Sequence, residues 1–285
     1  MSWQILIGVS VFLYSISVLL QRILLKNEKS EPISFSIFFQ FGVALITAVL
    51  VLAVKGKLAL PNLSNISWSV LVMTLLYAFA NISIFKSLKE IEASRFTVIF
   101  SSKTLFAVLG ASLVFNENLN VTQWIGALII ILGVVVVSIK NVKLKLGRGD
   151  LLAFVAAIFF GLANTNDRFL VKFFDPYSYV VIGFLLPGFL IAILNPGKIS
   201  KLRIYLNKSM IYKMILLCTI YGLSAVAFFA ALQIAPNSSQ VFAINAFTGV
   251  LTVVFAIIFL KEKDYLSRKI LGAILSLIGL LLVNK

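Results

Sequence analysis

The stretch QRILLK at residues 21–26 has a near copy, DRFLVK, at residues 167–172. Each stretch closes a long apolar run, and each is soon followed by an acidic residue and a proline, beginning at Glu31 in the first case and Asp175 in the second. The copies stand 146 residues apart in a chain of 285 residues. An offset of about half the chain predicts that the sequence contains two related halves.

The composition indicates that lipid surrounds much of the chain. Hydrophobic residues make up 61% of the sequence and charged residues 12%, about half the charged fraction of a typical soluble protein, and the mean hydropathy is +1.06. The net charge of +15 comes mostly from basic residues between apolar runs, which favours basic loops of a membrane protein over a nucleic-acid-binding surface. The chain has no His and one Cys, Cys218, so we expect no zinc site, catalytic triad, disulfide framework or cofactor.

Ten apolar runs approach the roughly 20 helical residues that a bilayer core about 30 Å thick requires. They are continuously apolar, whereas the strands of a membrane barrel would alternate. The first run lacks the basic start and small-residue cleavage site of a signal peptide, so we expect it to be a retained span. The predicted spans are residues 3–25, 33–54, 67–88, 95–115, 121–139, 150–172, 178–194, 210–231, 239–260 and 267–283.

Five spans fall in each half, residues 1–145 and 146–285. Because five is an odd number, the second half must enter the membrane from the opposite face. The predicted fold is therefore an all-α integral membrane protein with ten transmembrane helices arranged as two inverted five-helix repeats. Such proteins commonly bind substrate near the midplane between the repeats, which rock to expose the site alternately. Duplication for packing alone is the other interpretation.

The last part of each half carries the most specific motif. The segments are FNENLNVTQWIGALIIILGVVVVS at residues 115–138 and LKEKDYLSRKILGAILSLIGLLLV at residues 260–283. Each has an acidic residue followed by two glycines seven residues apart, namely Glu117, Gly126 and Gly133 in the first and Glu262, Gly272 and Gly279 in the second. We expect these glycines to allow close helix contact.

With its ten spans in two halves, the chain resembles the EamA-type branch of the drug/metabolite transporter superfamily over almost its whole length. The second half departs slightly, with ten residues from Glu262 to Gly272 against nine from Glu117 to Gly126. The resemblance implies a secondary carrier for small metabolites, with a central cavity lined by both halves and no ATP-binding part. It does not identify the substrate.

Lys103 is the only basic residue well inside a predicted span. A lysine near the middle of a bilayer costs about 2.5 to 3.5 kcal/mol on insertion scales, so we expect Lys103 to line the cavity and attract an anionic or zwitterionic substrate. The alternative is that its side chain extends along the helix to the nearer headgroups. Nucleotide-sugar carriers of the same superfamily look similar at this position, which favours the first interpretation.

Other polar side chains inside the spans are weaker candidates for substrate binding, because hydrogen bonding between helices can explain each one singly. Asn164 opens a polar run that ends with Asp167 and Arg168, and we expect those two charged residues to mark the membrane surface. Pro187 and Gly188 interrupt the seventh span, and this interruption is either a hinge or a static bend. The remaining candidates for the binding site are Gln40, Asn81, Asn245, Tyr14 and Ser102.

The sequence favours a transporter over an enzyme, because no paired carboxylates, metal ligands or His lie close together. A lipid flippase or a structural membrane protein remains the alternative. All ten acidic residues lie at or near predicted span ends, so exchange or facilitated diffusion is favoured, and Asp167 is the one candidate that would contradict this. The expected partners are a small metabolite and membrane lipid, and we expect a monomer.

We expect a multi-pass protein of the cell membrane. Lys and Arg number 19 in the loops after the odd-numbered spans and 5 on the other face. By the positive-inside rule both termini would lie outside, whereas relatives of the resembled family generally have them in the cytoplasm. A reporter fused at Lys285 would decide between these orientations.

Overall fold

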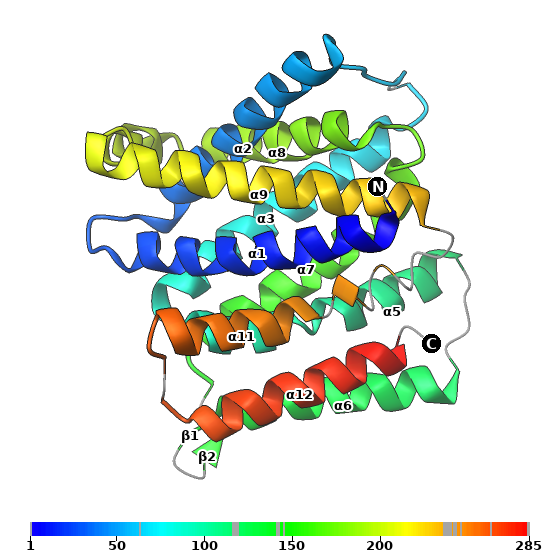
Figure 1. The fold of residues 1–285 in the computed structure, drawn as a ribbon, viewed down its shortest axis with the longest axis vertical. Coiled ribbons are helices and arrows are strands. Elements are labelled where there is room, and N and C mark those ends of the chain that lie inside the picture. Colours follow the sequence, from blue (N-terminus) through cyan, green and yellow to red (C-terminus); the bar gives the residue numbers. More distant parts are fainter. Residues whose placement is uncertain are drawn as a thin grey trace.

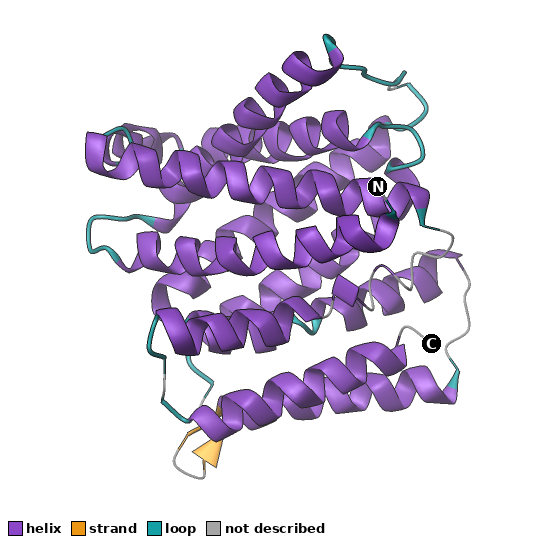
Figure 2. Ribbon diagram, viewed as in Figure 1, coloured by secondary structure: helices purple, strands orange, loops and turns teal. Residues whose placement is uncertain are grey.

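The computed structural model is built almost entirely of helices (Figure 2). It describes the following residues: 2–62, 64–115, 120–140, 143–144, 146–235, 241, 244–245, 247–262 and 264–283. Glu117, the acidic residue of the motif in the first half, lies outside them.

The helices of the first half are α1 (Trp3–Lys26), α2 (Pro32–Lys55), α3 (Ser67–Glu90), α4 (Ala93–Phe100), α5 (Lys103–Phe115) and α6 (Val121–Ser138). A short antiparallel pair, β1 (Ile139–Lys140) and β2 (Lys143–Leu144), joins the halves. The second half contains α7 (Arg148–Leu170), α8 (Pro176–Leu194), the 3₁₀ helix η1 (Pro196–Ile204), α9 (Lys208–Ile234), α11 (Phe247–Phe259) and α12 (Leu266–Val283).

Most predicted spans coincide with a helix to within three residues at each end, but the fourth does not. The expected span 95–115 is split into α4 and α5, and residues 101–102 between them form a turn. The serines at this break bond backward to nearby carbonyls, Ser101 to Val98 at 2.6 Å and Ser102 to Ile99 at 2.8 Å, as serines do when they compete with helix bonding. For the ninth span the structure describes α11 and three residues before it.

Two pairs of corresponding helices, α6 with α12 and α2 with α8, pack against each other in antiparallel fashion. In the α6 and α12 pair (Figure 1), a Cβ added to Gly279 would meet the carbonyl oxygen of Gly126 at 2.6 Å, and one added to Gly133 would meet that of Gly272 at 2.8 Å. The lower-numbered glycine of one helix thus faces the higher-numbered glycine of the other. The glycines allow close backbone contact, as the sequence predicted.

The same relation holds for α2 and α8. Lys55 at the end of α2 bonds to Asp175 just before α8 at 3.2 Å, whereas Gln40 in the first part of α2 lies against Gly188 in the later part of α8. Two further close packings are related by the repeat. Helix α3 packs on α7, and their counterparts in the other half, α9 and α1, pack on each other in the same way. This pairing is the arrangement expected of a duplicated chain with an internal twofold relation.

The outer surface is apolar, as lipid requires. On α2, Leu45, Val49 and Leu52 are each more than half exposed, and their spacing places them on one face of the helix. By length and composition, six helices of the described chain could each cross a membrane: α1, α2, α3, α7, α8 and α9. Apolar side chains that a soluble protein would bury are therefore directed outward.

Two sides of the bundle can be distinguished. The start of α1 and the end of α12 lie on one side, called here the terminal face, and the connections after α1, α3, α6, α8 and α11 lie on the opposite side, called the basic face (Figure 1). The loops richer in Lys and Arg are those of the basic face.

Candidate functional site

A cavity lies between the two halves of the chain. Its wall is formed by side chains of α1, α3, α5, α7, α8 and α9, together with Asn245. The wall is largely aromatic, with hydroxyl, amide and ammonium groups interspersed, which suits a small molecule that has both polar and apolar parts.

The cavity extends from the middle of the bundle toward the terminal face. At 1.5 Å per residue, Asn81 lies about 21 Å from the start of α3, which is near mid-membrane. Tyr179 lies only about 5 Å from the start of α8, and Phe229 about 8 Å from the end of α9. Because both of those helix ends belong to the terminal face, the cavity approaches that face and stops short of the other.

Lys103, the first residue of α5, projects into this cavity. Its Nζ lies 4.7 Å from the centre of the Phe160 ring and 4.8 Å from that of Phe100. The ring of Tyr14 is 5.5 Å away. Aromatic faces stabilise a cation at such distances, yet no carboxylate of the described residues forms an ion pair with Lys103.

The break between α4 and α5 determines where Lys103 stands. Because the helix restarts at this residue, the positive dipole end of α5 lies next to the ammonium group, while its first N–H groups bond to the turn, Thr104 to the Ser101 carbonyl at 3.2 Å and Leu105 to that of Ser102 at 3.0 Å. Gly161 of α7 fixes the position, since a Cβ there would meet the Lys103 carbonyl oxygen at 2.3 Å and Phe106 Cβ at 2.6 Å. Only glycine allows α7 to approach α5 this closely.

Five of the seven predicted binding residues line the cavity: Lys103, Asn164, Asn81, Asn245 and Tyr14. The other two lie outside its wall. Gln40 is fully buried between α2 and α8, and its amide has no hydrogen-bond partner among the residues that the structure describes. Ser102 is buried at the helix break, where its hydroxyl bonds to Ile99.

Asp167 differs from the sequence-based expectation. We expected it to mark the membrane surface, but it is 2% exposed. One carboxylate oxygen accepts a hydrogen bond from the hydroxyl of Tyr179 and the other from the hydroxyl of Tyr77. Asp167 lies three residues before the end of α7, but α3 and α8 pack around it and exclude solvent.

The sequence reasoning also missed the tyrosines of the cavity wall, Tyr77, Tyr179 and Tyr221. Tyrosine in membrane proteins concentrates at the two membrane interfaces. Tyr77 and Tyr221 occupy the middle parts of α3 and α9, so their depth was the signal that could have identified them.

Ion pairs between the two halves close the basic face. Arg95 of α4 bonds through two nitrogens to Asp150 of α7, at 2.5 and 2.8 Å, and both side chains are buried. Lys269 Nζ lies 2.6 Å from Glu92. The sequence placed Arg95 and Lys269 at span ends, yet both are less than 9% exposed. Unlike Lys103, these two cations already have carboxylate partners.

Glu262, from the acidic and glycine motif, strengthens this closure. Its carboxylate accepts hydrogen bonds from the backbone N–H groups of Ala93 and Ser94, both at 3.0 Å, and from the Ser94 hydroxyl at 2.6 Å. A carboxylate at a helix N-terminus is stabilised by the free N–H groups and the helix dipole. The motif of the second half therefore caps α4 of the first.

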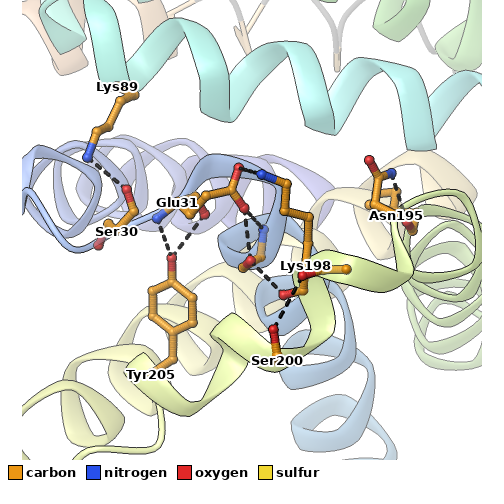
Figure 3. Close-up of polar contacts among 10 residues, drawn as sticks. Ser30, Glu31, Lys89, Asn195, Lys198, Ser200 and Tyr205 are labelled. Carbon is orange, nitrogen blue, oxygen red and sulfur yellow. Dashed lines mark hydrogen bonds and ion pairs between the residues drawn. The ribbon is translucent and has the colours of Figure 1, made fainter.

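A further set of polar contacts between the two halves on the basic face is centred on Glu31 (Figure 3). Its carboxylate accepts from the Ser34 N–H at 2.8 Å and lies 3.5 Å from Lys198 Nζ. Burial acts to raise the pKa of Glu31, but these bonds and the lysine charge outweigh it and hold the pKa below its ordinary value. Burial raises the pKa of Tyr205 to about 12, so its hydroxyl keeps its proton and donates to the Glu31 carbonyl at 3.0 Å.

The predicted hinge residues lie within α8, which continues without interruption through Pro187. Both Pro187 and Gly188 are buried, and a Cβ on Gly188 would meet Gln40 Cβ at 3.0 Å. Gly188 thus has a packing role against α2. Hinge motion at these two residues stays a prediction.

Comparison with known proteins agrees with this architecture. Residues 1–139 and 147–285 match the model of the EamA-like transporter family. The fold is similar to that of a solved crystal structure with a TM-score of 0.64 and 15% sequence identity, over 96% of each chain. No curated protein matches the chain.

Proposed function

We propose, on the premise that the chain belongs to the EamA-like transporter family, that it is a secondary transporter for a small polar metabolite that is anionic or zwitterionic. The family match makes the chain a multi-pass integral membrane protein built from two repeats. The observation that carries the substrate class is Lys103, an ammonium group in the cavity wall without a carboxylate partner among the described residues.

The proposed fold has ten spans in two inverted repeats, residues 1–145 and 146–285. The antiparallel packing of α6 with α12, and of α2 with α8, supports opposite orientations for the two repeats. In this scheme α4 and α5 together form one broken span, a feature typical of transporter binding sites near the midplane.

Alternating access is the proposed mechanism. The inter-repeat ion pairs of the basic face, and the extension of the cavity toward the terminal face, support a state closed on one side. Rocking of the repeats would break those pairs and bring the cavity to the basic face. We further propose a monomer in the cell membrane, surrounded by lipid, with the basic face in the cytoplasm and both termini outside.

Reconstitution in liposomes tests the transport function. The probes are radiolabelled glutamate, leucine, glucose phosphate and glucose, which differ in charge, together with a fluorescent phospholipid. Uptake of the anionic or zwitterionic probes supports the proposal, whereas movement of the phospholipid alone would indicate a flippase.

Lys103→Gln tests the role of the charge. Hydrogen bonds to charged groups contribute about 1.5 to 3 kcal/mol, so KM for a charged probe should rise by roughly 10- to 100-fold, with a smaller change for glucose. Lys103→Arg should retain part of the affinity, and Lys26→Gln, at an exposed lysine of α1, should behave as the wild type. Equal loss for charged and neutral probes would contradict the role of the ammonium group.

A further inference from the structure

Asp167 is a carboxylate that the transport scheme above does not use. It is 2% exposed, and no Lys or Arg of the described residues forms an ion pair with it. Ionised groups buried without a cation are costly, and in membrane proteins they mark proton relays and ion pathways. The side chain therefore calls for a functional explanation.

The two donors to Asp167 connect it to the cavity. Tyr77 and Tyr179 both line the cavity wall, and their hydroxyl groups bond to different oxygens of the same carboxylate. Tyr77 belongs to the first repeat, whereas Asp167 and Tyr179 belong to the second. The cluster is thus a bond between the repeats as well as a part of the substrate site.

We propose that Asp167 is a proton-binding site and that the proton it takes up and releases is coupled to transport. The inference rests on the proposed transport function. A bare carboxylate accepts from both phenols. When a proton binds, one oxygen becomes an O–H donor, so the phenol facing that oxygen turns its own hydroxyl proton away and accepts instead. The bond between Tyr77 of α3 and Asp167 of α7 is then no longer charge-assisted and is weaker, and deprotonation restores it.

The surroundings of Asp167 favour a proton over a metal cation. The charged and titratable side chains nearby are Tyr77 of α3, Tyr179 of α8 and, farther along the same cavity wall, Tyr221 of α9 and Lys103 of α5. The adjacent Arg168 is partly exposed, and Arg95 of α4 bonds to Asp150 at the other end of α7. Phenol O–H groups pointing at the carboxylate supply donors, whereas a metal cation needs several oxygen acceptors around it.

Asp167 is also placed to exchange protons with one side of the membrane. It stands about 5 Å from the end of α7 at 1.5 Å per residue, on the side of the terminal face toward which the cavity extends. Rocking of the repeats would open the basic face, close the terminal face and so change the face to which the carboxylate is connected. Proton and metabolite would then cross in a linked cycle, in place of the uncoupled exchange that the sequence favoured.

Infrared difference spectroscopy of the purified protein tests proton binding without any cargo. Acidification should produce the carbonyl stretching band of a protonated carboxylic acid, and Asp167→Asn should abolish that component. Asp264→Asn, at an exposed aspartate, should keep it, and Asp167→Glu should restore a carboxyl band. Persistence of the full band in Asp167→Asn would overturn the assignment.

Proteoliposomes test the coupling, with the radiolabelled probe that the wild type takes up and a pH-sensitive dye inside. A pH gradient imposed at clamped membrane potential should drive uptake by the wild type, Asp264→Asn and Asp167→Glu, but not by Asp167→Asn, in which exchange at equal pH persists. Dependence on a sodium gradient instead, or an unchanged response of Asp167→Asn to the pH gradient, would contradict the proposal. If the wild type moves no probe at all, the transport function itself fails, while the infrared band still decides whether Asp167 binds a proton.

Discussion

At the scale of single residues, the buried cations of this chain differ in the groups that they contact. Arg95 and Lys269 are buried and already neutralised by carboxylates from the opposite half. Lys103 has three aromatic rings instead. A paired cation contributes to holding the halves together, whereas a cation that faces only ring surfaces retains its capacity to bind an anionic group. This difference separates the cations that connect the repeats from the proposed binding residue, Lys103.

Gly161→Ala should displace Lys103 without changing its chemistry. The added methyl group would overlap the Lys103 carbonyl and Phe106, and overpacking of this kind costs about 1 to 3 kcal/mol. We expect a lower melting temperature and weaker uptake of charged probes. Gly8→Ala is the matched control, because a Cβ there meets nothing within 4 Å. Equal behaviour of the two variants would show that α5 is not held by this contact.

Much of the cavity wall was predictable from residue type and depth, but the buried carboxylate of Asp167 was not. Lys103, Asn164, Asn81, Asn245 and Tyr14 could be found because large polar groups are unfavourable against lipid. Asp167 was assigned to the surface because its position along the helix indicates its depth in the membrane but not which neighbouring helices shield it from solvent. The burial of Asp167 depends on tyrosines of α3 and α8, and these are tertiary contacts that the sequence alone does not reveal.

At the scale of the helices, composition and length were sufficient to place most elements. The break between α4 and α5 was not predictable from hydropathy, because the residues on both sides are apolar and the two serines at the turn are common inside membrane helices. Some of the helix caps could also be predicted from the sequence. Glu31 and Asp175, noted in the sequence before prolines, both bond to the first free N–H groups of the helices that follow.

The cap of α2 should make stability sensitive to acid. Because the pKa of Glu31 is lowered in the folded protein, its contribution is complete above the ordinary value of 4.5 and is lost as the pH falls through the folded pKa. Loss of a helix cap typically costs about 1 kcal/mol. Glu31→Gln should therefore lower the melting temperature at neutral pH and reduce its decline toward about pH 3.

Glu28→Gln is the control for this cap, since Glu28 is exposed on the same loop. It should leave the acid-dependent decline in melting temperature as in the wild type. If the wild type and Glu31→Gln decline in parallel, the carboxylate of Glu31 is not responsible for the acid sensitivity.

At the scale of the whole molecule, the repeats meet differently at the two faces. On the basic face, buried or partly buried ion pairs and the Glu262 cap connect α4 with the second repeat. Toward the terminal face, the repeats are separated by a cavity with tyrosine walls. A sequence can reveal that two halves are related, but which face is closed depends on the contacts between them and therefore required the structure.

A reversible cross-link across the basic face would test whether closure must be released during transport. In a Cys218→Ala background, Glu92→Cys with Lys269→Cys replaces an ion pair of 2.6 Å by two thiols from different repeats. A short bifunctional thiol reagent with a reducible link should arrest probe uptake, and a reductant should restore it. Each single-cysteine variant loses the same ion pair but cannot be bridged, so treatment should leave its uptake rate unchanged. Continued uptake by the bridged protein would mean that cargo crosses without separation of the repeats at this face, and alternating access would have to be abandoned.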